Sequence, residues 1–129
     1  MTSDLDAVRA HYAASDRGDL DGMLAVLAPE VRWTEAAGFP LAGTYVGPAA
    51  VADGVFRRLA EDFDGFSLTV DEVLDAGGRI VGVGTYRGTN RSTGKAFEAR
   101  VVHLWRMEDG HAVAFEQVAD TALVQAASA

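Results

Sequence analysis

The 129-residue chain contains no cysteine. A disulfide bond, a zinc–thiolate site and a cysteine nucleophile are therefore excluded. Basic residues are also scarce: 11 Lys and Arg stand against 19 Asp and Glu, which leaves a formal net charge of -8 at pH 7. A protein of this charge is repelled by the phosphates of nucleic acids, so we expect no nucleic-acid partner.

Long hydrophobic runs are absent as well. No apolar run approaches the roughly 20 residues that cross a membrane. The N-terminal segment MTSDLDAVRA is acidic and lacks the apolar stretch of a signal peptide. These features predict a cytoplasmic protein with no membrane contact. The length and the 49% hydrophobic content predict one domain, residues 1–129, with a buried core.

The most informative segment that is present is KAFEARVVHLWRMEDGHAVAFEQVAD, residues 95–120. Its Asp-Gly pair separates two alternating runs and predicts a tight hairpin turn, because both residue types tolerate a positive φ. Side chains alternate along a strand, so Phe115 and Gln117 share one face of the returning strand. One face of the outgoing strand carries Phe97, Ala99, Val101, His103 and Trp105. A polar group within such an apolar face indicates a small-molecule site.

Helical signals occupy the first half of the chain. Ser3 or Asp4 caps a first helix that stops at the Arg-Gly pair near residue 18. Asp19 caps a short second helix, which we expect to end at Pro29 because proline cannot continue a helix.

Strand signals dominate the second half. The segment VRWTE is predicted as a first strand, and the Gly/Pro-rich segment after it as a loop. Pro48 suits the first turn of a third helix. The remaining expected elements are strands at 66–74 and 80–89, the two strands of the hairpin, and a small terminal helix at 121–127. Helices followed by a run of antiparallel strands form an α+β pattern, with the sheet curved into an open cone around the helices.

Three segments carry a family resemblance: GDLDGMLAVLAPEVRWTE, WRMEDGHAV and VADTALV. Together they resemble the SnoaL-like branch of the NTF2-like superfamily, which also includes ketosteroid isomerases, limonene epoxide hydrolases and polyketide cyclases. The resemblance covers essentially the whole chain. It implies an α+β fold, an NTF2-like cone in which three helices of the N-terminal half pack on a curved, mostly antiparallel sheet. Because this scaffold carries several unrelated functions, the function must be argued from the site.

Glu35 is the first candidate catalytic residue. It stands at the end of the first strand, where the resemblance to ketosteroid isomerases places a proton-shuttling carboxylate. In an apolar cone its pKa would be raised, and it could abstract a proton next to a carbonyl group. Trp33 points the same way by alternation. The alternative is a strand-end glutamate that is simply exposed to solvent.

Two further candidates follow from the same resemblance. His103 matches the oxyanion-hole acid of the isomerases and can also donate a hydrogen bond to a developing oxyanion. The isomerase tyrosine falls near His11 and Tyr12. Counting back from the segment DRGD selects His11, whereas helical spacing from Leu5 and Val8 selects Tyr12, which we take as the inward residue. The alternatives are a core histidine bonded to a carbonyl and a core aromatic residue.

Several other site types find no support in the sequence. Gln117 stands where the resemblance to polyketide cyclases places an aspartate, and an amide is no general base at neutral pH. The Asp-Arg-Asp arrangement of the epoxide hydrolases is missing. The three histidines show no metal-ligand spacing, so we expect neither a metal nor a cofactor. The apolar pocket is predicted to be lined by Trp33, Phe56, Trp105, Phe115 and Gln117.

Three functional hypotheses remain open. The first is a cofactor-free, isomerase-like or cyclase-like enzyme that transfers a proton next to a carbonyl of a hydrophobic small molecule, with Glu35 as base and with His103 and Tyr12 as oxyanion donors. The second is a non-catalytic binder of a hydrophobic metabolite. The third is a subunit with a vestigial pocket. We also expect a homodimer through the outer sheet face, where Val102 and Leu104 need to be covered.

Overall fold

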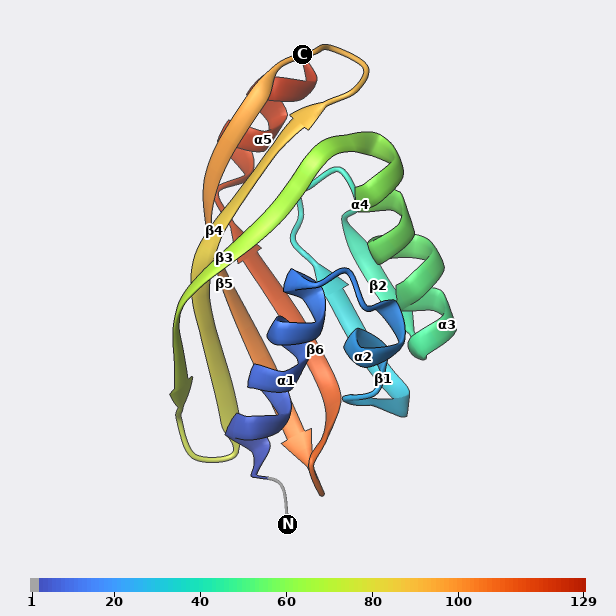
Figure 1. Cartoon of the computed structure of the whole chain (residues 1–129), viewed down its shortest axis with the longest axis vertical. Helices are drawn as coiled ribbons and strands as arrows, with labels where there is room; N and C mark the ends of the chain where they lie inside the picture. Colours follow the sequence, from blue (N-terminus) through green and yellow to red (C-terminus); the bar gives the residue numbers. More distant parts are fainter. Residues whose placement is uncertain (1–2) are drawn as a thin grey trace.

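The computed structural model describes residues 3–129. The N-terminal half contributes α1 (Asp4–Asp16), α2 (Leu20–Leu24), β1 (Leu27–Glu35), β2 (Gly43–Val46), α3 (Pro48–Val51), the π-helical turn η1 (Ala52–Phe56) and α4 (Arg57–Asp62). The C-terminal half contributes β3 (Phe63–Asp75), β4 (Arg79–Asn90), β5 (Ala96–Glu108), β6 (His111–Ala119) and α5 (Thr121–Ser128). Helices come first and long strands last, which confirms the predicted α+β class (Figure 1).

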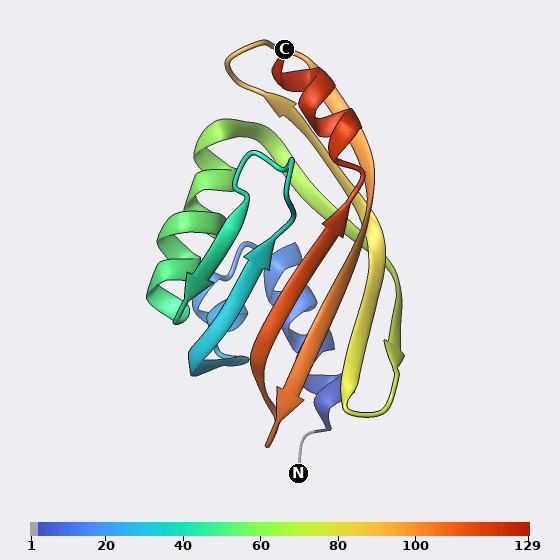
Figure 2. The same cartoon turned by 180° about the vertical axis from the view of Figure 1, so that it is seen from behind.

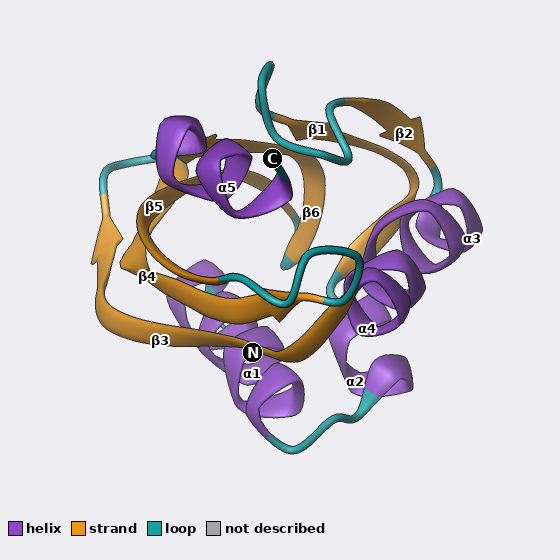
Figure 3. Ribbon diagram, turned by 90° about the horizontal axis from the view of Figure 1, so that it is seen from above, coloured by secondary structure: helices purple, strands orange, loops and turns teal. Residues whose placement is uncertain are grey.

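The strands form one curved, six-stranded sheet in the order β2-β1-β6-β5-β4-β3. Neighbouring strands are antiparallel, except for the parallel pair of β1 and β6. The helices α1 to α4 lie on the concave side, and Figure 2 shows the opposite face of the sheet in front of them. Seen from above, the sheet curves around the interior and α5 lies over one end of it (Figure 3). The sheet and helices therefore enclose a cone-shaped interior.

Local signals place the starts of the first two helices as predicted. The Ser3 side chain accepts a hydrogen bond from the backbone N–H of Asp6, and the Asp19 side chain accepts one from Gly22. Each cap satisfies a backbone N–H that has no partner inside the helix. Gly18 follows α1 with a φ of 68°, a conformation that glycine adopts without steric cost.

Two predicted boundaries are wrong. The second helix ends at Leu24 rather than Pro29, and β1 begins at Leu27, so that Pro29 lies within a strand. The pairing of β1 with β6 shifts register between Leu27 and Arg32, and proline is tolerated at such an irregularity because it cannot donate a ladder hydrogen bond.

The loop predicted between the first strand and the third helix contains the short edge strand β2. Its four residues are mostly exposed, so they lack the alternation that marks a half-buried strand. The predicted third helix is confirmed, with a π-helical turn in its middle. Gly54 lies in that turn, where a Cβ atom would come within 2.4 Å of the Tyr45 ring, so only glycine lets this ring pack against the helix.

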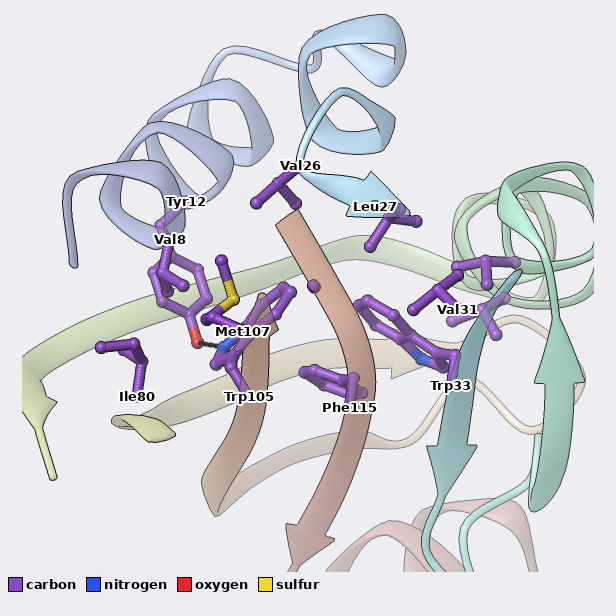
Figure 4. Packing of buried hydrophobic residues seen from close by; sticks show 13 residues of the cluster. Val8, Tyr12, Val26, Leu27, Val31, Trp33, Ile80, Trp105, Met107 and Phe115 are labelled. Carbon is purple, nitrogen blue, oxygen red and sulfur yellow. Dashed lines mark hydrogen bonds between the residues drawn. The ribbon is translucent and has the colours of Figure 1, made fainter. Parts of the chain in front are cut away.

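The hydrophobic core fills the concave side of the sheet. On β5 the side chains of Phe97, Ala99, Val101, His103 and Trp105 are all buried on one face, as the alternation predicted. Trp33 and Phe115 stack with ring centroids 3.6 Å apart, beneath the first two helices (Figure 4). Within residues 3–129, no helix is long and apolar enough to cross a membrane.

Candidate functional site

A cavity of about 500 Å³ opens between the sheet and the helices α2 and α4. Most of its wall is apolar and includes Met23, Trp33, Val55, Phe56, Leu59 and Phe66. Buried polar side chains in the same wall are His11, Glu35, Tyr86 and His103. An apolar wall with a few convergent polar groups is typical of a small-molecule site.

The polar groups lie along one row of the sheet. His103 on β5 pairs with Gln117 on β6 and with Gly82 on β4. Thr34 pairs with Glu116, so Glu35 on β1 takes the next position beside Gln117. At the other end of the row, Gly82 has no side chain and so leaves space on the inner face of the sheet. A Cβ atom there would come within 2.2 Å of the Tyr12 hydroxyl, which occupies that place from α1.

A continuous chain of hydrogen bonds runs through this row. Trp105 Nε1 donates to the Tyr12 hydroxyl over 2.9 Å, and that hydroxyl lies 2.9 Å from His103 Nδ1 (Figure 4 shows the first of these bonds). His103 Nε2 lies 2.7 Å from the Tyr86 hydroxyl. Gln117 Nε2 donates to the same hydroxyl over 3.0 Å. Both ring nitrogens of His103 are thus bonded to tyrosines.

The Gln117 amide is itself held in one orientation. The backbone N–H of Ala36 donates to Gln117 Oε1 over 3.1 Å, so the amide nitrogen is the atom that faces Tyr86. This bond also joins the end of β1, where Glu35 stands, to the network on β5 and β6. The amide therefore connects the backbone of Ala36, just after Glu35, to the Tyr86 hydroxyl.

Glu35 lacks the partners that a buried carboxylate usually has. Its side chain is 3% exposed, and its Oε2 atom has no hydrogen-bond partner among residues 3–129. Burial raises the pKa of Glu35 from its usual value near 4.5 to about 8, because a carboxylate loses its hydration there, and the nearby Trp33 indole opposes this only in part. Glu35 is therefore mostly protonated at neutral pH.

The two buried histidines are neutral. Burial lowers the pKa of His103 to about 3, with a smaller contribution from His11. Burial likewise lowers the pKa of His11 to about 4, against the raising effect of its bond to the Met23 carbonyl. His11 Nδ1 lies 2.8 Å from that carbonyl oxygen, which can only accept, so Nδ1 carries the proton of His11.

The predicted site residues divide into two layers. Glu35, His103, Trp33 and Phe56 line the cavity. The other four, Tyr12, Trp105, Phe115 and Gln117, are buried but are not part of its wall. On the first helix, the two candidates His11 and Tyr12 are both buried. His11 lines the cavity, and Tyr12 lies behind His103. The roles of these residues stay predictions.

Tyr86 is a polar residue of the cavity wall that was not among the predicted site residues. It lines the cavity and is 6% exposed. It follows Ile80, Gly82 and Gly84 at the same parity of β4, and all of these are buried. That alternation could have placed it on the inner face, but it could not have revealed its bond to His103. In the part of the chain that the structure describes, no three His, Asp or Glu side chains gather as metal ligands would.

Comparison with known families identifies this architecture. The profile of the SnoaL-like domain matches residues 8–115. The chain belongs to the SnoaL-like family. No protein among those with curated functional descriptions matches the SnoaL-like chain. The family supports small-molecule binding.

Solved structures agree with this assignment. An NTF2-like protein from Burkholderia thailandensis E264 is 50% identical, with 100% of this chain and 99% of that chain covered and a TM-score of 0.98. TerC, co-crystallized with polyporic acid, is 30% identical over 96% of both chains with a TM-score of 0.84. A Catenulispora acidiphila protein with a ketosteroid isomerase-like fold is 17% identical over 95% of this chain and 92% of that chain, with a TM-score of 0.80, which shows the fold alone. The predicted NTF2-like cone is confirmed.

Proposed function

We propose that this SnoaL-like protein is a cofactor-free enzyme that moves a proton next to a carbonyl group of a hydrophobic small molecule. Glu35 is the base, and the network of His103 and Tyr12 stabilises the charge that develops on the carbonyl oxygen. The observation that carries the proposal is a buried carboxyl group with an unpaired oxygen, in the same apolar cavity wall as His103. An unpaired buried polar atom costs about 1–3 kcal/mol, so a functional reason for it is expected.

The raised pKa of Glu35 suits this role. A carboxylate with a pKa of about 8 is a stronger base than an ordinary one, because it regains its proton more readily. The reactive form is the minor, ionised fraction at neutral pH. The neutral histidines add no positive charge to the cavity, and so they do not lower the basicity of Glu35.

In the proposed step, the ionised Glu35 takes a proton from the carbon next to the carbonyl. The electron pair of the broken C–H bond forms the enolate double bond, and the negative charge moves to the oxygen. The protonated Glu35 carboxyl group then delivers a proton to another carbon, so that the double bond shifts and no group is gained or lost, and exchange of the carboxyl proton with the solvent lets deuterium enter the product. For this the reacting carbon must lie within about 3–3.5 Å of the Glu35 carboxylate.

Replacement of Glu35 by Gln tests the proposal. Cyclic β,γ-unsaturated ketones are offered, and exchange of their acidic protons for deuterium is followed by NMR. Glu35→Gln keeps the shape and removes the base, so exchange should fall by about 10²–10⁴-fold. The matched control is Glu30→Gln, which changes an exposed glutamate of the same strand. Unchanged exchange in Glu35→Gln would show that Glu35 is not the base.

A non-catalytic binder is the second candidate function. It is favoured by one observation: both ring nitrogens of His103 already have protein partners. TerC was co-crystallized with polyporic acid, which makes this compound a suitable probe for the cavity. Binding is measured through quenching of tryptophan fluorescence, since Trp33 lines the cavity. Binding of polyporic acid, together with no exchange for any ketone, would favour the binder over the enzyme.

A further inference from the structure

In the hydrogen-bond chain around His103, one tyrosine hydroxyl proton has no acceptor within the chain. Two of its bonds have a fixed direction, because an indole N–H and an amide N–H can only donate. The Tyr12 hydroxyl thus accepts from Trp105, and the Tyr86 hydroxyl accepts from Gln117. Neutral His103 supplies one donor and one acceptor to these two hydroxyls. Neutral His103 can therefore accept a hydrogen bond from only one of the two tyrosine hydroxyls.

The tautomer of His103 decides which tyrosine keeps a spare proton. With the proton on Nε2, His103 donates to Tyr86, and Tyr12 donates to Nδ1. The Tyr86 oxygen then accepts two hydrogen bonds, and its O–H is free. With the proton on Nδ1, the two hydrogen bonds of His103 reverse while those from Trp105 and Gln117 stay as they are, and the free O–H belongs to Tyr12.

The surroundings of the two hydroxyls are unequal. The Tyr12 hydroxyl is enclosed by Trp105, His103 and the backbone at Gly82, and it has no acceptor for a spare proton among residues 3–129. Tyr86 lines the cavity, where a ligand oxygen or water can accept its proton. A buried donor without an acceptor costs about 1–3 kcal/mol. This difference favours the proton of His103 on Nε2.

We propose that Tyr86 is the residue that donates the hydrogen bond to the ligand oxygen in the cavity, and that His103 is a positioning residue that keeps the Tyr86 O–H free for it. This inference rests on the proposed function and names the donor of that same site. Three further residues do not contact the ligand but fix the direction of the hydrogen bonds to His103 and Tyr86: Tyr12, Trp105 and Gln117.

The electrostatics of the cavity agree with a donor that keeps its proton. Burial holds the pKa of Tyr86 well above its usual value of 10, and the charge of Glu35 adds to this effect. Tyr86 therefore stabilises a developing enolate by a hydrogen bond without losing its own proton. Glu35 and Tyr86 line the same cavity, so one can act as the base while the other binds the oxygen.

The tautomer of His103 tests this inference without any substrate. In protein with ¹⁵N-labelled histidine, NMR distinguishes a protonated from an unprotonated ring nitrogen through its chemical shift. We expect Nε2 of His103 to be protonated and Nδ1 to be unprotonated. Exposed His111 is assigned through its own replacement by Gln, and buried His11 serves as an internal reference with the opposite tautomer. A proton on Nδ1 of His103 would overturn the inference.

The Tyr86→Phe variant tests the role in the reaction. Loss of one oxyanion donor lowers kcat by about 10²–10³-fold, and we expect this loss with little change in KM. Tyr45→Phe is the matched control, because its hydroxyl donates to the Leu41 carbonyl outside the cavity wall. If Glu35→Gln is inactive but Tyr86→Phe keeps full activity, the proposed function stands and the Tyr86 inference fails. Should Tyr86→Phe not fold, the tautomer measurement on the unchanged protein still decides.

Discussion

At the scale of single residues, the site depends on groups that destabilise the fold where they stand. Glu35 is held away from water with an unpaired oxygen, and His103 and His11 are held neutral. Each shift of pKa on folding is also a dependence of stability on pH. The site and the stability of the protein are therefore coupled through the same protons.

The pH dependence of stability should reveal Glu35 directly. Its folded pKa of about 8 lies above the usual 4.5, so its contribution is complete below pH 4.5 and is lost as pH rises through 8. The free energy of unfolding of the wild type should fall between pH 6.5 and about 9. Glu35→Gln should lack this fall, and Glu30→Gln should retain it. Urea unfolding at a series of pH values measures the effect, and parallel curves for wild type and Glu35→Gln would contradict it.

The two buried histidines should act in the opposite direction. Their folded pKa values of about 3 and 4 lie below the usual 6.5, so their contribution is complete above pH 6.5 and is lost as pH falls through those values. Together with Glu35, they predict maximal stability near pH 6.5 for these groups.

Gly82 should be as important for the site as the polar residues around it. In Gly82→Ala the new Cβ would lie 2.2 Å from the Tyr12 hydroxyl and would push it off His103 and Trp105. We expect a loss of about 1–3 kcal/mol in the free energy of unfolding, typical of an overpacked core. In a Tyr12→Phe background the loss should be smaller, because the oxygen is gone, and a double-mutant cycle measures the difference. Full additivity would show that the two side chains do not meet.

At the scale of elements, the alternation of apolar side chains and the helix-capping residues were sufficient to predict features of elements that have one buried face. The inner face of β5 and the cap of α1 could be predicted in this way. The strand β2 could not, because an exposed edge strand has no such pattern. The hydrogen-bond network could not be predicted either: Tyr12 and Tyr86 are 91 and 17 positions from His103, and they come from another helix and another strand.

The terminal helix α5 offers a test of packing at this scale. Val124 is fully buried against the end of the sheet, whereas the adjacent Leu123 is 47% exposed. Val124→Ala removes two buried carbon atoms and should lower the free energy of unfolding by about 2 kcal/mol. Leu123→Ala should change it by less than about 0.5 kcal/mol. Thermal and urea unfolding of both variants provide the comparison, and equal losses would mean that α5 is not docked as described.

At the scale of the whole molecule, the outer face of the sheet is unusual in two ways. Val83, Val102 and Val118 lie side by side across three strands, next to Leu104, and Val118 is 49% exposed. Beside this apolar patch runs a row of basic side chains, Arg32, Arg79 and Arg106, in a protein of net charge -8. None of the three arginines forms an ion pair within residues 3–129.

Two of the charged side chains on the outer face of the sheet, Glu98 and Arg100, already form ion pairs within the chain. Glu98 pairs with Arg87, and Arg100 pairs with Asp71. Glu116 has no such partner among the described residues and lies on the same face as the arginine row. In a two-fold pair of sheets, the arginines of one subunit can meet Glu116 of the other around a central apolar contact. Such rim pairs set orientation more than affinity.

We therefore expect a homodimer through this face, with the valine patch at its centre. An isologous interface is self-complementary, so one substitution acts twice in each dimer. Val118→Asp would place two carboxylates at that centre and should give a monomer. Leu123→Asp is the matched control, because it adds the same charge at an equally exposed apolar residue of α5. Light scattering at tens of micromolar protein measures the mass. A monomeric wild type, or a dimer that Val118→Asp leaves intact, would exclude this face as the interface.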